Sequence, residues 1–193
     1  MEVYALLLAS TLNAGTVLAL AALGELIGEK AGVLNLGVEG MMLCAAIAAF
    51  AIGVHSGSDT VGFIGGIVTG ALLAAVFGWL VIWLGTNQYA TGLALMLFGT
   101  GLSAFVGIDY VQASLGNRPR FNWFGLGDIP LLGPALFRLH PLVYATMLLA
   151  LAMIWWLYRT RSGLVLRSVG EAPDSAHALG YPVRMIRLAA VVF

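Results

Sequence analysis

Long apolar runs alternate with short polar inserts along the whole of this 193-residue chain. A helix that crosses a bilayer needs about 20 predominantly apolar residues. Four segments meet or approach that length, and each is expected to be a membrane-spanning helix: Val3–Leu23, Val61–Leu84, Tyr89–Ile108 and Leu142–Leu157. The pattern therefore predicts an all-α protein, built as a polytopic transmembrane helical bundle.

A fifth apolar run, Met41–Val54, has only 14 residues, which is short for a membrane span. To cross the bilayer, its helix must begin near Leu34, and Asn35 and Glu39 then enter the membrane. Otherwise the segment is a broken or re-entrant helix. Both alternatives bring the preceding polar stretch, GEKAGVLNLGVEGMM (28–42), to membrane depth.

The composition agrees with a membrane protein and narrows the remaining classes. Hydrophobic residues make up 61% of the chain and charged residues 9%, with a mean hydropathy of +0.97. A soluble domain carries roughly 25% charged residues. Nine basic and nine acidic residues cancel, so the chain has no overall basic field that would attract nucleic acid. The single cysteine, Cys44, can form neither an intrachain disulfide nor a cysteine metal cluster.

The distribution of arginine and lysine predicts the orientation in the membrane. Five of the nine basic residues lie between Arg159 and Arg187, and such residues collect in cytoplasmic loops. This places that segment and Lys30 inside, and the N-terminus outside. The connection Asp109–Pro141 is then outside, although it carries three arginines that oppose the assignment. It is expected to be either a plain interfacial connector or a docking or gating surface.

The polar stretch 28–42 is the first candidate for function. Each of its four glycines costs about 1 kcal/mol relative to alanine in a helix. Non-helical backbone at membrane depth is tolerated only in a protein interior or beside a water-filled cavity, and broken helices of this kind supply substrate sites in many transporters. Asn35 and Glu39 are therefore candidate residues of a substrate pathway. The structural alternative is that Glu39 caps a helix start, as Glu25, Glu29 and Lys30 mark a cytoplasmic turn.

A second polar insert, GTNQYATG (85–92), separates two predicted spans and carries no charge. Thr86 is expected to cap the following helix, since threonine is a favoured N-cap residue. Asn87 and Gln88 can both donate and accept hydrogen bonds to a base or a sugar, which makes them candidate pathway residues. The alternative is a tight interhelical turn. Small residues on the next helix suit close packing: Gly92, Gly99, Gly101 and Ser103.

The third polar stretch reads RSVGEAPDSAHALGYPVRMIR. Pro173 suits the first turn of a short helix, and Gly180 suits its end. Ala172, Ala176 and Leu179 follow a spacing of three to four residues and predict one apolar face. The stretch thus predicts a short amphipathic helix across the cytoplasmic mouth, which is either a connector at the membrane surface or a docking helix.

Three motifs in this order resemble the permease subunits of bacterial ABC importers: ALGELIGEKAGVLNLGVEGMML, NQYATGLALMLFGTGLSAFVG and LRSVGEAPDSAHALGYPVRMIRLAAVVF. The resemblance covers nearly the whole chain. It is nearest to the simple-sugar and nucleoside branch of the branched-chain amino acid and ribose permease superfamily. It implies a multi-pass subunit of the bacterial cytoplasmic membrane that carries a nucleoside, a simple sugar or a similar small solute.

The same resemblance implies the partners of the chain. These are cytoplasmic ATPase subunits, a second permease that is identical or homologous, and an extracytoplasmic solute-binding protein or lipoprotein. No phosphate-binding G-x-x-x-x-G-K-[ST] motif occurs in the chain, in keeping with ATP hydrolysis on a separate subunit. No cofactor or metal is implied.

The segment Glu171–Gly180 resembles the EAA-type coupling helix of these permeases, which sits in a groove of the ATPase. By this resemblance, the residues that contact the ATPase are Arg167, Glu171, Ala172, Ala176 and Gly180. The chain departs from the family pattern at Pro173, where a second alanine is expected. Family members are longer than this chain, and apolar character rises again in its last ten residues. We therefore expect residues 1–193 to be a single permease domain that is truncated inside a sixth membrane helix.

Two other classes are weighed against a permease. An ion-coupled secondary transporter of a small polar solute would use intramembrane charges, for which Glu39 alone offers little. A membrane hydrolase would need a nucleophile and base or metal ligands, and neither H-E-x-x-H nor G-x-S-x-G occurs. The three histidines, His55, His140 and His177, are expected in solvated loops or at segment ends. The chain is therefore predicted not to be an enzyme, and its solute is not specified by the sequence.

Overall fold

The computed structural model describes residues 2–113 and 141–193. Its elements are α1 (Glu2–Lys30), α2 (Val38–Ser56), α3 (Asp59–Ile82), α4 (Gln88–Gly107), η1 (Ile108–Tyr110), α5 (Pro141–Arg159), α6 (Arg161–Glu171), α7 (Pro173–Ala178) and α8 (Val183–Val192). No strand occurs in these two ranges, as the all-α prediction requires. The chain forms two compact units, Met1–Leu23 with Asn117–Thr160, and Gly24–Gly116 with Arg161–Phe193.

Five helices of the described residues are long and apolar enough to cross a membrane. They lie in α1, α2, α3, α4 and α5, with α4 continuing through η1, so the chain is a multi-pass membrane protein. The predicted spans are confirmed, but two boundaries were wrong. The α1 helix continues past Leu23 to Lys30, and α2 begins at Val38 rather than near Leu34, yet its 19 residues are long enough to cross. The α2 helix gains its length at both ends, through Val38–Gly40 and His55–Ser56, because a few polar or small residues at a helix end do not stop it.

In the first unit, α5 buries one side only. Its buried residues recur every three to seven positions, as expected for one face of a helix: Val143, Thr146, Met153 and Leu157. The Thr146 hydroxyl donates to the Leu142 carbonyl at 2.7 Å, which satisfies the only polar group on that face. The opposite side of α5 is apolar and exposed, as lipid contact requires.

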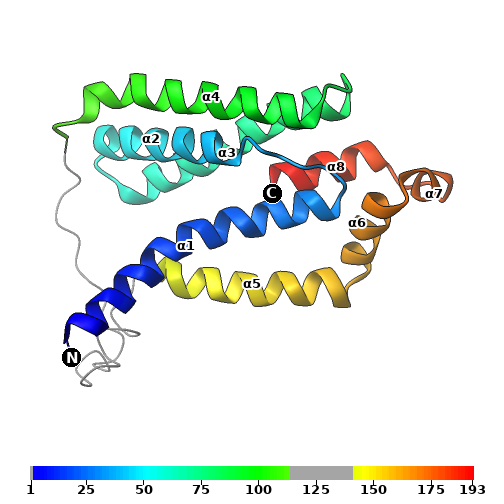
Figure 1. Cartoon of the computed structure of the whole chain (residues 1–193), viewed down its shortest axis with the longest axis horizontal. Coiled ribbons are helices and arrows are strands. Elements are labelled where there is room, and N and C mark those ends of the chain that lie inside the picture. The colour runs from blue at the N-terminus through cyan, green and yellow to red at the C-terminus, as the bar shows by residue number, and fades with distance from the viewer. Residues whose placement is uncertain (1, 114–140) are drawn as a thin grey trace. The chain divides into compact units, whose positions relative to one another are not determined.

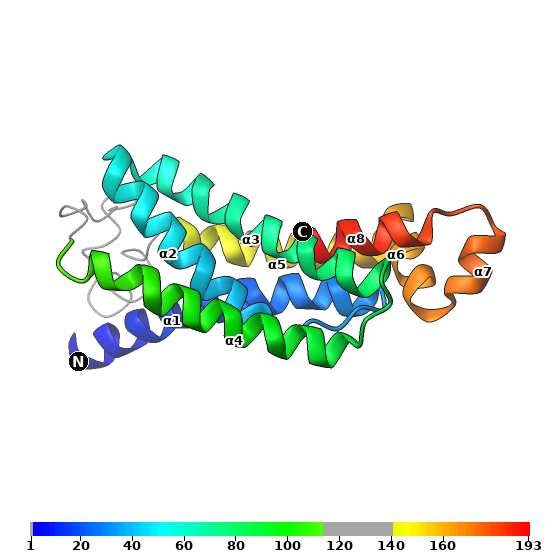
Figure 2. The same ribbon diagram turned by 90° about the horizontal axis from the view of Figure 1, so that it is seen from above.

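In the second unit, α2 packs between α3 and α4, and α8 lies along α3 (Figures 1 and 2). The α2–α3 connection turns at Gly57, whose φ of +64° lies in the region that glycine adopts without strain. Glycines also bring α2 and α3 together. A Cβ atom on Gly62 would lie 2.6 Å from the Ala49 carbonyl oxygen, so only a residue without a side chain fits there.

The contact between α2 and α4 is closer still. A Cβ atom on Gly40 would lie 2.6 Å from the Met96 Cα atom, and one on Gly99 would overlap the backbone of Gly40. The predicted role in helix packing is thus confirmed for Gly99, whereas Gly92 lies against the backbone of Leu36 and Gly37, before α2 begins. The prediction was wrong for Gly101, where a Cβ atom would have no neighbour within 4 Å. The difference is one of helical phase, since Gly101 lies two residues, and so about 200°, away from Gly99.

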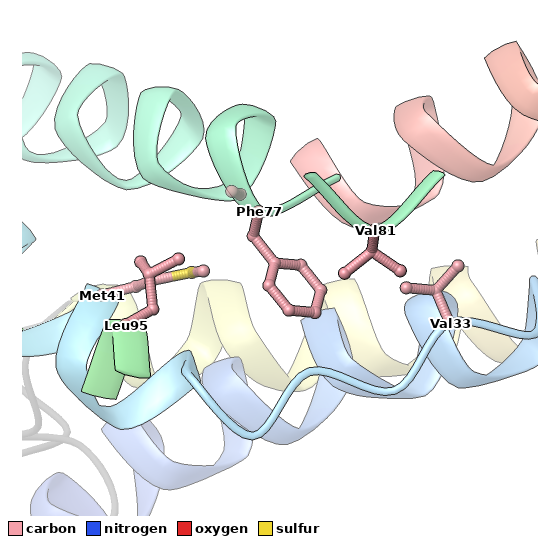
Figure 3. Close-up of a cluster of buried hydrophobic side chains, with 6 residues drawn as sticks. Val33, Met41, Phe77, Val81 and Leu95 are labelled. Atoms are coloured by element: carbon pink, nitrogen blue, oxygen red, sulfur yellow. The ribbon is translucent and has the colours of Figure 1, made fainter. Parts of the chain in front are cut away.

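A cluster of buried side chains fills the space between α2, α3, α4 and the segment that follows α1 (Figure 3). Phe77 of α3 is fully buried and points from its helix into the middle of the cluster. Val33 comes from the segment after α1 and is 2% exposed. The remaining members are Met41, Ala74, Val81 and Leu95. This core anchors a non-helical segment, through Val33, to three membrane helices.

Most of the predicted outer connection, Asp109–Pro141, lies outside the described residues, and so does His140. Of the other two histidines, His55 lies at the exposed end of α2 and His177 on α7. The His55 ring packs edge-on against Tyr110.

Candidate functional site

The residues between α1 and α2, 31–37, form a non-helical crossover segment within the second unit. Gly32 adopts a φ of +80°, which ends α1 and turns the chain. The chain is non-helical between α1 and α2, although Gly28 and Gly40, two of the four glycines in the polar stretch, are helical. Exposed non-helical backbone is costly in lipid unless its polar groups find partners. The partners of the crossover segment thus decide whether it is stable at membrane depth.

The first part of the crossover segment is held by the end of α1. The Val33 amide donates to the Gly28 carbonyl at 3.0 Å, and the Gly32 amide donates to the Glu29 carbonyl at 2.9 Å. Bonds of this kind occupy the carbonyls that a helix leaves without partners at its C-terminus.

The middle of the crossover segment is held by two side chains from different helices. The Leu34 amide donates to Oε1 of Gln88, the first residue of α4, at 2.8 Å. The Asn35 amide donates to Oε1 of Glu25, in the last two turns of α1, at 2.8 Å. Gln88 and Glu25 thus replace the helical partners that these two amides lack.

Asn35 supplies the third internal support. Its Oδ1 atom accepts from the Gly37 amide at 2.9 Å, and its Nδ2 atom donates to Sδ of Met41 at 3.5 Å. The residue is only 8% exposed. In this conformation the Asn35 amide group shapes the chain that leads into α2, and its role as a pathway residue stays a prediction.

Glu39 has a different environment, since it lies exposed in the first turn of α2. An acidic side chain in the first turn of a helix is stabilised by the partial positive charge of that end. The N-cap residue itself, Gly37, makes no side-chain hydrogen bond. The position fits both roles that the sequence left open, a helix-start charge and a pathway carboxylate.

The cap of α4 corrects one prediction. The N-cap residue is Asn87 and not Thr86, and its Oδ1 atom accepts from the amides of Tyr89 and Ala90 at 3.0 and 3.1 Å. Asn87 is extended, with φ −64° and ψ 121°, as an N-cap residue must be. Thr86 lies one residue too early for this geometry, and its hydroxyl instead accepts from the Thr91 hydroxyl at 2.9 Å.

The predicted short helix exists as α7, which begins at Pro173 and is followed by Gly180 with a φ of +88°. It is joined to α6 by Ala172 alone. The Ala172 amide donates to the Ser168 carbonyl of α6 at 2.9 Å, and the Ala172 carbonyl accepts from the Ala176 amide at 3.0 Å. Because these bonds cross the joint, α6 and α7 are tied together at the end that Figure 2 shows projecting beyond α8.

The predicted apolar face of this helix was wrong in part. Ala176 is 2% exposed, but Leu179 is 78% exposed and Ala172 is exposed as well. The physical reason is the shortness of α7, which has six residues. Ala172 and Leu179 are its two caps, so they fall outside the helical spacing that would place them on one face. Of the other predicted coupling residues, Glu171 is the exposed last residue of α6, and Arg167 lies part-buried one turn earlier.

A cavity of about 550 Å³ opens between α3, α7, the start of α8 and the crossover segment. Val33 and Gln88 line it on one side, and Asp174 and His177 of α7 line it on another. Arg187 of α8 also lines the cavity, and its Nε atom donates to the Ala31 carbonyl at 3.0 Å. Both the crossover segment and α7 therefore border this cavity. In the described ranges, no three His, Cys, Asp or Glu residues are grouped so that they could hold a metal ion.

Sequence reasoning missed two residues of this site. Glu25 was interpreted as part of a cytoplasmic turn because the predicted span ended at Leu23. Arg187 was used only as evidence for orientation. The available signal was the rule that an ionisable residue within or next to a membrane span has a function by default.

Comparison with known proteins identifies the family of the chain. Residues 7–193 match the family described as branched-chain amino acid transport system / permease component. A putative glucose ABC transporter permease protein of Haloferax volcanii is 45% identical over 96% of this chain and 58% of its own length. A guanosine ABC transporter permease protein of Bacillus subtilis is 30% identical over 99% of this chain and 64% of its own length. A nucleoside ABC transporter permease protein of Lactococcus lactis is 28% identical over 97% of this chain and 62% of its own length.

The chain therefore belongs to the branched-chain amino acid transport system / permease component family. It spans less than two thirds of the length of each of these three relatives. No solved structure matches it.

Proposed function

We propose that this chain is part of the permease subunit of an ATP-driven importer, which moves a sugar, a nucleoside or a similar small solute across the cytoplasmic membrane. The observation that carries the proposal is the family match over residues 7–193, together with 45% identity to a putative glucose ABC permease across 96% of the chain. The five candidate spans supply the membrane part that such a subunit requires.

The crossover segment supports a transport role within that family. The side chains of Glu25 and Gln88 accept hydrogen bonds from its amides, so this non-helical segment is stabilised between two membrane helices. Non-helical backbone next to membrane helices can contribute to a solute site in a transporter, because its backbone groups can face the solute. We assign Glu39, exposed beside the break, to the solute pathway, and we assign Asn35 and Gln88 to shaping it. We also assign Asn87 to the pathway, because it caps α4 directly before Gln88.

The short helix α7 supports an ATPase contact. This six-residue helix buries only Ala176, carries the exposed Asp174, and is flanked by the exposed residues Glu171 and Leu179. Such a surface is suited to a protein partner rather than to the lipid phase. We propose that cytoplasmic ATPase subunits bind here. We further propose that a second permease, identical or homologous, and an extracytoplasmic binding protein complete the complex, and that ATP hydrolysis takes place on the ATPase.

The solute is proposed from the relatives. The names of the three relatives refer to glucose, guanosine and nucleosides, and the glucose relative has the highest identity of the three. All these solutes are small and rich in hydroxyl groups, so we propose a neutral sugar or nucleoside. A sugar is favoured over a nucleoside because the glucose relative has the higher sequence identity to this chain.

Reconstitution tests this function. Full-length permease, its ATPase and its binding protein are placed in proteoliposomes, and uptake of radiolabelled glucose, ribose, guanosine and adenosine is measured. We expect uptake of one of these solutes that requires ATP and persists when ion gradients are collapsed. The matched control is an ATPase whose phosphate-loop lysine is replaced by alanine, which should abolish uptake. Uptake that needs an ion gradient and continues with the disabled ATPase would establish a secondary transporter instead.

A further inference from the structure

Arg187 of α8 contacts the C-terminal ends of two other helices at once. Its Nε atom donates to the Ala31 carbonyl, directly after α1, at 3.0 Å. Its Nη2 atom donates to the Val169 carbonyl, in the last turn of α6, at 3.4 Å. One guanidinium therefore caps α1, which leads into the crossover segment, and α6, which leads into α7.

The two helix ends that Arg187 joins lie against each other. A Cβ atom on Gly170 of α6 would overlap the Lys30 carbonyl oxygen, and one on Gly32 would lie 3.2 Å from the Gly170 carbonyl oxygen. Each helix C-terminus carries a partial negative charge of roughly half an electron. Two such ends in backbone contact repel each other, and the positive charge of Arg187 offsets that repulsion.

The surroundings of these bonds are dry. Ala31 and Val169 are both 0% exposed, so the two carbonyls have little access to water. Hydrogen bonds from a charged donor are about twice as strong as neutral ones, and a low local dielectric strengthens them further. The contact between α6 and the crossover segment thus depends on Arg187 rather than on solvent.

We propose that Arg187 is a positioning residue that transmits the movement of the α6–α7 pair to the crossover segment. The inference rests on the proposed function, in which an ATPase binds α7 and the solute passes the crossover segment. A displacement of α7 moves α6 as well, because hydrogen bonds at Ala172 connect the two helices. The displacement of α6 then moves the Ala31 carbonyl, because the guanidinium of Arg187 is hydrogen-bonded to both.

Arginine is suited to this task because its planar fork presents several N–H groups in fixed directions. The Nε and Nη2 atoms contact two different carbonyls without a change in side-chain conformation. A lysine at this position would keep the positive charge but offer a single point of contact. Its three N–H groups radiate from a single nitrogen, so it lacks the two separate donor atoms with which Arg187 reaches the two carbonyls.

The test measures coupling rather than activity alone. The complete transporter is reconstituted with wild-type permease, Arg187→Met, Arg187→Lys or Arg184→Met, and the number of solute molecules imported per ATP hydrolysed is determined. Arg184 is the matched control, because it lies one turn earlier on α8, lines the same cavity and is exposed. A merely structural defect would lower uptake and ATP hydrolysis in proportion and leave their ratio unchanged.

We expect the ratio to fall about tenfold in Arg187→Met, because both bonds from the charged donor are lost. It should fall about threefold in Arg187→Lys, which keeps the charge and loses the fork. Arg184→Met should keep the wild-type ratio. The inference would be overturned if Arg187→Met and Arg187→Lys both kept the wild-type ratio. If Arg187→Met does not assemble, a wild-type ratio in Arg187→Lys is sufficient to overturn the inference. Absence of ATP-driven uptake by the wild type would instead refute the proposed function.

Discussion

The contact between Gly40 of α2 and Gly99 of α4 allows a sharp test of the packing. In Gly99→Ala, the new Cβ atom would overlap the Gly40 carbonyl and lie 2.7 Å from the Gly40 Cα atom. No flexible side chain is involved, so relief requires the two helices to move apart. In Gly101→Ala, on the same helix, the Cβ atom would have no neighbour within 4 Å.

The size of the effect follows from this geometry. Two carbon atoms attract best at about 3.5–4.0 Å, so α2 and α4 must separate by on the order of 1 Å. Overpacking of this kind costs about 1–3 kcal/mol, and contact with a backbone places Gly99→Ala at the upper end. Membrane helices form before they associate, so α4 is helical in both the associated and the dissociated state. The helix propensity of alanine therefore contributes little to the free energy of association. Gly101→Ala should therefore be close to neutral.

The assay is thermal unfolding of purified full-length permease in detergent. A change of 1 kcal/mol shifts the Tm by about 2–4 °C in a protein of 150–250 residues and by less in a longer one, so Gly99→Ala should melt below Gly101→Ala by up to roughly 6–12 °C. Both substitutions add the same methyl group to the same helix. Equal Tm values, or a lower value for Gly101→Ala, would refute the packing of α2 against α4.

Three further predictions concern the polar parts of the chain. Asn87→Ala should destabilise the permease by about 1 kcal/mol through loss of the α4 cap, and thermal unfolding should show no such loss in Thr86→Ala. Glu39→Gln keeps the shape of the side chain and removes its charge, so solute uptake should fall while the complex still assembles; wild-type uptake at all solute concentrations would leave only the helix-start role. Ala176→Trp overfills a site that is 2% exposed, at a cost of about 1–3 kcal/mol. Recovery of the ATPase in a pull-down should therefore fall about tenfold or more, and equal recovery would remove α7 from the ATPase contact.

The membrane spans could be predicted from the sequence because transfer into lipid depends on the composition of a segment and hardly on its partners. The limits of α1 and α2 could not. The first apolar run ends at Leu23, but α1 continues to Lys30. The short apolar run begins at Met41, but α2 begins at Val38. Hydropathy reports where a segment prefers lipid, whereas a helix ends where its backbone hydrogen bonds end.

The candidate site was predicted only in part because its bonds join distant parts of the chain. The Leu34 amide and Gln88 are 54 residues apart, and Ala31 and Arg187 are 156 residues apart. Such pairings depend on tertiary packing, and residue types in one sequence do not reveal them. The Thr86 and Asn87 pair shows the same limit at short range. Both residue types are good N-caps, but only Asn87 accepts the hydrogen bonds of the first turn of α4.

The central claim is that the crossover segment borders the path of the solute, and cysteine reactivity tests it most directly. Leu36 lies in the crossover segment and is 42% exposed, whereas Leu97 lies in the middle of α4 and is 74% exposed. Each is replaced by cysteine in a Cys44→Ala background, and the reconstituted transporter is treated with a small charged thiol reagent. A thiol reacts as its thiolate, which forms in water and not in lipid.

We expect Leu36→Cys to react during ATP-driven turnover and to be protected by the transported solute. Leu97→Cys should remain unmodified under the same conditions, despite its greater exposure in the isolated chain. An unreactive Leu36→Cys, or one that reacts equally with and without solute, would contradict the placement of the crossover segment on the pathway.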